Sequence, residues 1–148
     1  MMKSASAVTA VLFLIISASL NASDAVTRMQ FTTAIIDHEP VDEIGQLDKA
    51  VPKVFFFTEI TGMAGQTITH RWQHEGKIKA SIKFNIGGDR WRVWSSKKLL
   101  PQWVGIWTVT VLDADDNILG EADMVYVPAG ATADTLNQGT DQAQKNKP

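Results

Sequence analysis

Residues 77–86 form the run KIKASIKFNI, in which polar and apolar side chains alternate from end to end. Alternation with a period of two is typical of a β-strand with one buried face, because successive side chains of a strand point to opposite sides of a sheet. The apolar side chains share one face: Ile78, Ala80, Ile82, Phe84 and Ile86. The other face carries Lys77, Lys79, Ser81, Lys83 and Asn85. The run therefore predicts a strand whose apolar face joins the core of an all-β protein.

Comparable β patterns lie on both sides of this run. Strands are predicted at 26–37, 54–60, 67–74, 90–96, 104–113 and 118–127. Residues 38–53 hold two prolines and a glycine, and they predict a loop with space for one short helical turn. About seven strands without a long helix favour an antiparallel β-sandwich of the immunoglobulin-like kind. Trp72 is then expected to be the buried tryptophan of one sheet.

The connection Gly87–Gly88 predicts how the run 77–86 pairs with the strand that follows it. Two glycines suit a two-residue hairpin, because both positions can adopt positive φ. That register pairs Phe84 with Trp91, Ile82 with Val93, Lys83 with Arg92, Asn85 with Arg90 and Ser81 with Trp94. A four-residue loop would keep the same faces. Both loops place Trp91 on the buried side and Trp94 on the outer side. Trp107 is also expected in the core, whereas the exposure of Trp103 is left open.

The two ends of the chain differ from the segment between them. Residues 1–25 have an early lysine, an apolar run and then small residues, which is the layout of a signal peptide cleaved after Ala25 or, alternatively, after Ala22. An uncleaved anchor is the other alternative. Residues 128–148 are small and polar and predict a disordered tail. We therefore expect one domain at 26–127 that is periplasmic or secreted and has no membrane span after cleavage.

Charge is distributed unevenly along the predicted domain. The net charge of −2 argues against a nucleic-acid partner, yet the segment from Arg71 to Lys98 has eight cationic and two acidic residues. Arginines can bind an anion through paired hydrogen bonds, and an exposed tryptophan offers a stacking surface. The candidate ligand-binding residues are Lys83, Arg90, Arg92 and Trp94, together with Lys97 and Arg71. The alternative is a solvated sheet face without a ligand.

Other residue patterns predict neither catalysis nor a cofactor. His70 and His74 lie four apart in a strand, so their side chains are about 13 Å apart and would not share a metal ion; His70 is expected near the edge of the core. The run DADDN (113–117) lacks the glycine and glutamate of a calcium loop and predicts a hairpin turn. Ser95 has no nucleophile elbow around it. Glu59 is expected to form an ion pair with Arg71 or Arg90.

Several motifs resemble a bacterial domain family of unknown function (DUF2914). They are FFFTEITGMAGQTITHRW, GGDRWRVWSSKKLLP and GIWTVTVLDADDNILGE, preceded by FTTAIIDHEPVD. The resemblance covers about residues 28–127 and implies an exported or membrane-attached all-β domain, with no reaction and no site residues. We therefore expect a non-enzymatic domain that binds an anionic envelope component, such as a glycan or lipid headgroup. The alternatives are an accessory module that binds an envelope protein through a sheet edge and, less favoured, a hydrolase.

Overall fold

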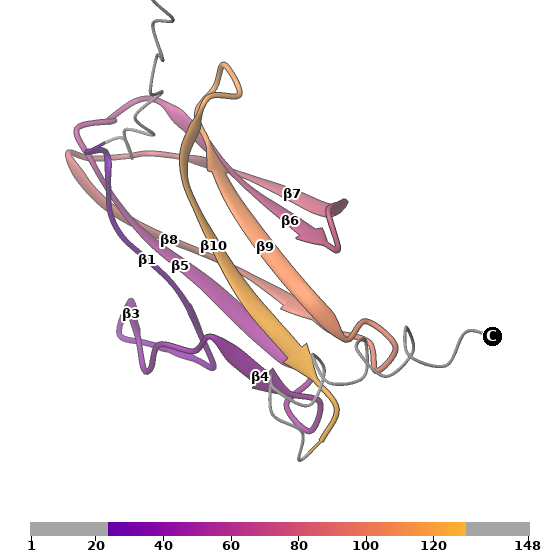
Figure 1. Ribbon diagram of the computed structural model, residues 1–148. Helices are drawn as coiled ribbons and strands as arrows, with labels where there is room; N and C mark the ends of the chain where they lie inside the picture. Colours follow the sequence, from indigo (N-terminus) through magenta and orange to yellow (C-terminus); the bar gives the residue numbers. More distant parts are fainter. Residues whose placement is uncertain (1–23, 130–148) are drawn as a thin grey trace, which may run out of the picture.

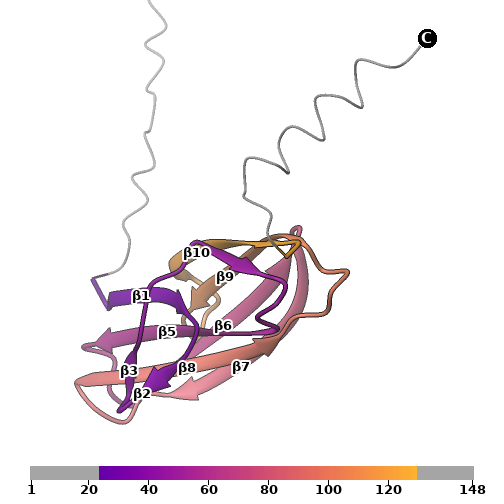
Figure 2. The ribbon, with the colours of Figure 1, turned by 90° about the horizontal axis from the view of Figure 1, so that it is seen from below.

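The computed structural model describes residues 24–129, so most of the predicted signal peptide and tail lie outside the described residues. The described chain forms two facing sheets and a small hairpin (Figures 1 and 2). The three-stranded sheet has the order β1 (Val26–Thr32), β5 (Lys53–Thr61), β8 (Arg90–Lys98). The five-stranded sheet has the order β4 (Gln46–Asp48), β10 (Ile118–Val127), β9 (Gly105–Leu112), β6 (Thr67–His74), β7 (Lys77–Asn85). The hairpin consists of β2 (Ile35–Ile36) and β3 (Glu39–Pro40).

This arrangement confirms the predicted all-β sandwich. Strands that follow one another in the chain often belong to different sheets, as in immunoglobulin-like domains. The segment 38–53 differs from its prediction as a loop with a helical turn. It contains β3 and β4, and β4 pairs in parallel with β10.

Aromatic side chains fill the space between the two sheets. Trp72 and Trp107 are fully buried, as predicted, and their ring centroids are 6.4 Å apart. Phe31 from the opposite sheet meets Trp72 edge-on at 5.8 Å. Edge-on contacts between rings add to the stabilisation that comes from removing their apolar surface from water. The core therefore holds the sheets together without a disulfide, since the chain has no cysteine.

The predicted hairpin between β7 and β8 is wrong. β7 pairs with β6 and β8 pairs with β5, so the residues around Gly87 cross from one sheet to the other. Lys83 lies opposite Thr69, and Arg92 lies opposite Glu59, which removes the predicted like-charge pair. The glycines instead allow the Trp91 ring to pack directly on the backbone, because a β-carbon at Gly87 would lie 2.8 Å from that ring.

A β-bulge changes the predicted face of one residue in β7. Trp72 lies opposite Ala80, whereas the next residue, Gln73, lies opposite Ile78, so Lys79 is the extra residue of the bulge. The bulge reverses the alternation at the start of β7. Ile78, predicted to be buried, is consequently 61% exposed.

Gly105 provides a test of backbone strain in this fold. Its φ is +117°, and a β-carbon there would clash with Glu75 Oε1, which accepts the Ile106 N–H. Gly105→Ala is therefore expected to lower the free energy of unfolding by about 2 kcal/mol. Gly45→Ala is the matched control, because a β-carbon at Gly45 meets nothing within 4 Å. Urea unfolding of both variants checks the prediction, and equal midpoints would contradict it.

Candidate functional site

Three arginines and two glutamates form a cluster on the outer face of the three-stranded sheet, hereafter the arginine cluster: Arg28, Arg90, Arg92, Glu39 and Glu59. Strand register explains its centre, because Glu59 of β5 lies between Arg28 of β1 and Arg92 of β8. Glu59 Oε2 accepts hydrogen bonds from Arg90 at 2.8 Å and Arg92 at 3.0 Å. The cluster confirms the predicted pair of Glu59 with Arg90.

Glu59 is the buried anchor of the arginine cluster. Its side chain is 6% exposed, and its other oxygen accepts a hydrogen bond from the Thr27 hydroxyl at 3.2 Å. Hydrogen bonds from Arg90, then from Arg92 and Thr27, outweigh the effect of burial and lower the pKa of Glu59 from 4.5 to about 2. Glu59 therefore remains ionised and fixes the positions of both guanidinium groups.

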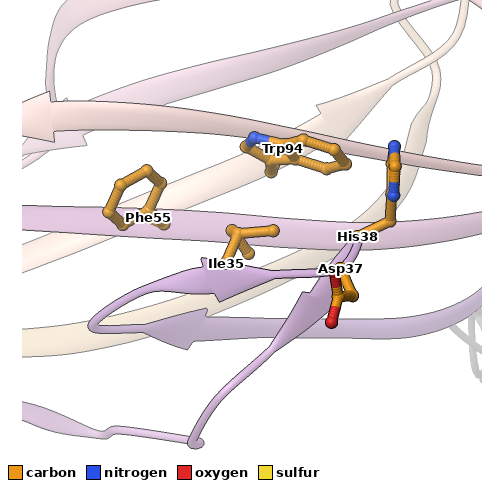
Figure 3. Close-up of a pocket in the computed structure, with 5 residues that line it drawn as sticks. All are labelled: Ile35, Asp37, His38, Phe55 and Trp94. Atoms are coloured by element: carbon orange, nitrogen blue, oxygen red, sulfur yellow. The ribbon is translucent and has the colours of Figure 1, made fainter.

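The β2–β3 hairpin lies over the same face and is held by the second glutamate. Glu39 contacts Arg28 and Arg92, each at 2.9 Å. The two turn residues, Asp37 and His38, have φ of 49° and 64°, which is the backbone of a tight hairpin but is uncommon without glycine. The turn directs the His38 ring toward Trp94, and the two rings meet edge-on with centroids 5.5 Å apart (Figure 3).

Two open depressions flank His38. The larger, of about 460 Å³, is lined by His38, Arg90, Trp91 and Arg92. The smaller, of about 330 Å³, is lined by Ile35, Asp37, His38, Phe55 and Trp94 (Figure 3). The larger depression combines guanidinium groups with an aromatic ring that is 41% exposed. This depression is the candidate site.

Trp91 is the site residue that the sequence interpretation assigned to the core. Trp91 lies two residues before the buried Val93, and alternation therefore predicts that both face the core. Trp91 lies at the start of β8, however, where its ring packs on the glycine connection and remains exposed. Trp94, the tryptophan chosen as a candidate, is on the outer face as predicted and is half-buried against His38. The two adjacent glycines before β8 were the available signal that a large ring packs there.

The structure divides the predicted ligand-binding residues among three places. Arg90, Arg92 and Trp94 lie together on the outer face of the three-stranded sheet. Lys83 and Arg71 belong to the other sheet, where Arg71 contacts Asp116 at 3.3 Å. Lys97 lies at the far end of β8, with its ammonium group 5.7 Å from the centre of the Trp103 ring.

A separate polar network lies inside the core around His70. Its ring nitrogens contact the hydroxyls of Thr58 at 3.0 Å and Ser95 at 2.9 Å, and the Trp72 indole N–H donates to Ser95. His70 is completely buried, deeper than predicted, and burial lowers its pKa to about 3. Thr58 and Ser95 belong to the three-stranded sheet and His70 and Trp72 to the five-stranded sheet, so the network links the two sheets.

The remaining candidate residues have structural roles. Asp113 accepts hydrogen bonds from the backbone of Asp115 and Asn117, which confirms a hairpin turn between β9 and β10. Within residues 24–129, no three His, Asp or Glu side chains are grouped as metal ligands. No helix in the same range has the length and hydropathy needed to cross a membrane.

Residues 65–124 match the model of a family described as "Protein of unknown function (DUF2914)". The match runs from the turn before β6 into β10 and includes Trp91, Arg90 and Arg92. No curated protein matches the chain.

Proposed function

Through residues 65–124 the chain belongs to the DUF2914 family, and we propose that it is an exported, non-enzymatic binding domain for an anionic component of the bacterial envelope. The observation that supports this proposal is the depression lined by His38, Arg90, Trp91 and Arg92. The described part of the chain places no other exposed tryptophan beside arginines.

The charge of the arginine cluster favours an anionic ligand. Its three guanidinium groups share two carboxylates, so the cluster keeps a net positive charge although each arginine is paired. Arg90 uses one terminal nitrogen for Glu59, and its side chain is 62% exposed. The other N–H groups of the Arg90 guanidinium therefore remain available for a carboxylate or phosphate. The hydrogen bond to Glu59 already fixes the orientation of this guanidinium.

The exposed ring beside the arginines favours a sugar acid as the ligand. Trp91 presents a flat apolar surface, and the C–H face of a pyranose ring can pack on it while its carboxylate reaches Arg90. A ligand with both groups would use both parts of the depression. We therefore propose uronic-acid glycans as the first ligand class.

Calorimetric titration of the chain with a uronic-acid oligosaccharide tests this function. The methyl-ester form of the same oligosaccharide is the ligand control, because it keeps the ring and loses the charge. The acid form is expected to bind, and Arg90→Gln and Trp91→Ala are each expected to weaken it about tenfold. Higher salt should weaken it further.

Arg71→Gln is the matched control variant, since it removes the same charge from the other sheet. It should leave the affinity unchanged. Equal binding of the acid and the ester, or equal loss in Arg71→Gln and Arg90→Gln, would contradict the assignment. Binding of glycerol phosphate without binding of the uronic acid would retain the site and change the ligand to a phosphate.

A second candidate function is docking to an envelope protein through a sheet edge. β7 and β8 are nine-residue strands, and each has one hydrogen-bonded neighbour in the described sheets. A free edge can accept a strand from a partner. This function predicts a concentration-dependent complex with little salt dependence, which sedimentation would distinguish from anion binding.

A further inference from the structure

The lysines gather at the end of the sandwich opposite the acidic turn, and we propose that this lysine end docks on the surface of an anionic phospholipid bilayer. The site is separate from the arginine cluster and does not depend on the function proposed for it. The lysine end is defined by Lys49, Lys53, Lys77, Lys79, Lys97 and Lys98.

The register of the strands places these lysines together. Lys53 at the start of β5 lies directly opposite Lys98 at the end of β8. Lys77 at the start of β7 lies opposite His74 at the end of β6. Lys49 donates its backbone N–H to Val127, the last residue of β10. Like charges directly across a sheet destabilise it, so this arrangement costs free energy unless an anion is present.

Trp103 brings two further ammonium groups together from different sheets. Lys79 Nζ is 5.2 Å and Lys97 Nζ is 5.7 Å from the centre of the Trp103 ring. Lys79 is the extra residue of the β7 bulge, and a bulge re-aims the side chain it carries. Within residues 24–129, neither ammonium group has a carboxylate partner.

The opposite end of the sandwich has four aspartates beside three cationic residues, Arg71, Lys83 and Arg90, so it is less positive than the lysine end. Asp113, Asp115 and Asp116 occupy the turn between β9 and β10, and Asp89 precedes β8. At the lysine end, Glu75 accepts the backbone N–H of Ile106 and Asp48 accepts that of Ala50. The domain is therefore an electric dipole along its strands. An extended anionic surface would orient the lysine end toward itself.

Exposed apolar side chains next to the lysines favour a bilayer over a soluble polyanion. Ile78 is 61%, Ile106 is 49% and Leu100 is 37% exposed. Ile78 and Ile106 lie at the starts of β7 and β9, and Leu100 follows the end of β8. Lysines that contact phosphate headgroups beside side chains that enter the acyl boundary are the pattern of a peripheral membrane surface.

Vesicle sedimentation of the full chain tests the proposal. The measured quantity is the ratio of partition onto phosphatidylglycerol-containing vesicles to partition onto pure phosphatidylcholine vesicles, in which any contribution from the N-terminal apolar residues cancels. The double variant Lys79→Gln/Lys97→Gln is expected to lower this ratio about 25-fold, because each lysine near an anionic bilayer contributes about fivefold. The thermal midpoint should show that the variant remains folded.

Lys83→Gln is the matched control, because it removes the same charge from β7 near the acidic turn, where Lys83 lines a depression with Asp113 and Asp116. It is expected to change the ratio less than about twofold. A ratio near one for the unmodified chain, or an equal loss in Lys83→Gln, overturns the proposal. Arg71→Gln, which removes a positive charge beside Asp116 on the same sheet as Lys79, should also change the ratio less than about twofold.

Discussion

Lowering the pH from 7.5 to 4.5 is expected to reduce the free energy of unfolding by about 2–3 kcal/mol through His70 alone. The pKa of His70 is about 3 in the folded protein because the ring is buried, whereas the ordinary value is 6.5. Below pH 6.5 the unfolded chain binds a proton that the folded chain does not, so stability is lost as the pH falls from 6.5 toward 3. Urea unfolding at several pH values measures the loss, which should be about 1.4 kcal/mol for each pH unit.

His70→Gln identifies the source of that slope. Glutamine can still hydrogen-bond with Thr58 and Ser95 but does not titrate. The variant should be less stable at pH 7.5 because the ring packing against Phe56 and Phe84 is lost. Its stability should change much less between pH 6.5 and 5. An undiminished slope in this window would show that another group causes the acid sensitivity.

Removing the charge of Glu59 is the second large effect. Glu59→Gln is expected to lower the free energy of unfolding by about 2–3 kcal/mol, because three guanidinium groups then lie together with one carboxylate. The estimate is below that for a fully buried pair, since the arginines are partly exposed. Urea midpoints at pH 7.5 measure the effect.

The pH dependence and a matched variant distinguish this effect from a packing defect. The pKa of Glu59 is lowered, so its contribution is complete above pH 4.5 and is lost as the pH falls toward 2. The difference between Glu59→Gln and the unmodified chain should therefore shrink over that range. Glu39→Gln, whose side chain is 41% exposed, should cost less than about 1 kcal/mol. Equal costs for the two glutamates would contradict the role of Glu59 as the anchor.

Local patterns in the sequence were sufficient for the fold class and for several faces. Alternation in β6 predicted that Trp72 is buried, and the acidic run 113–117 predicted the turn between β9 and β10. These inferences depend on neighbours within a strand or a turn. Of the two partners predicted for Glu59 across the sheet, Arg90 is confirmed, whereas Arg71 pairs with Asp116.

Pairing between strands could not be obtained in the same way. Period-two alternation indicates which face of a strand is buried but not which strand lies beside it. The alternation in β7 is equally compatible with pairing to β6 and with pairing to β8. The predicted Gly87–Gly88 hairpin matched apolar to apolar, but the two strands join different sheets. The bulge at Lys79 has no signal in the alternation, and neither does the exposure of Trp91 at a strand end. The arginine cluster needed the fold, because β3 supplies Glu39 from a segment predicted as loop.

The order of the strands also sets the order in which they can assemble. β6 and β7 are joined by the turn 75–76, and β9 and β10 by the turn 113–117, so these hairpins close over short chain distances. The three-stranded sheet joins β5 to β8 across residues 62–89, which makes its formation slower by loop-closure entropy. In a refolding experiment, protection of the β6–β7 amides from hydrogen exchange should precede that of β8. The Trp91 depression, which needs β8 in place, should then recover ligand binding in the last kinetic phase.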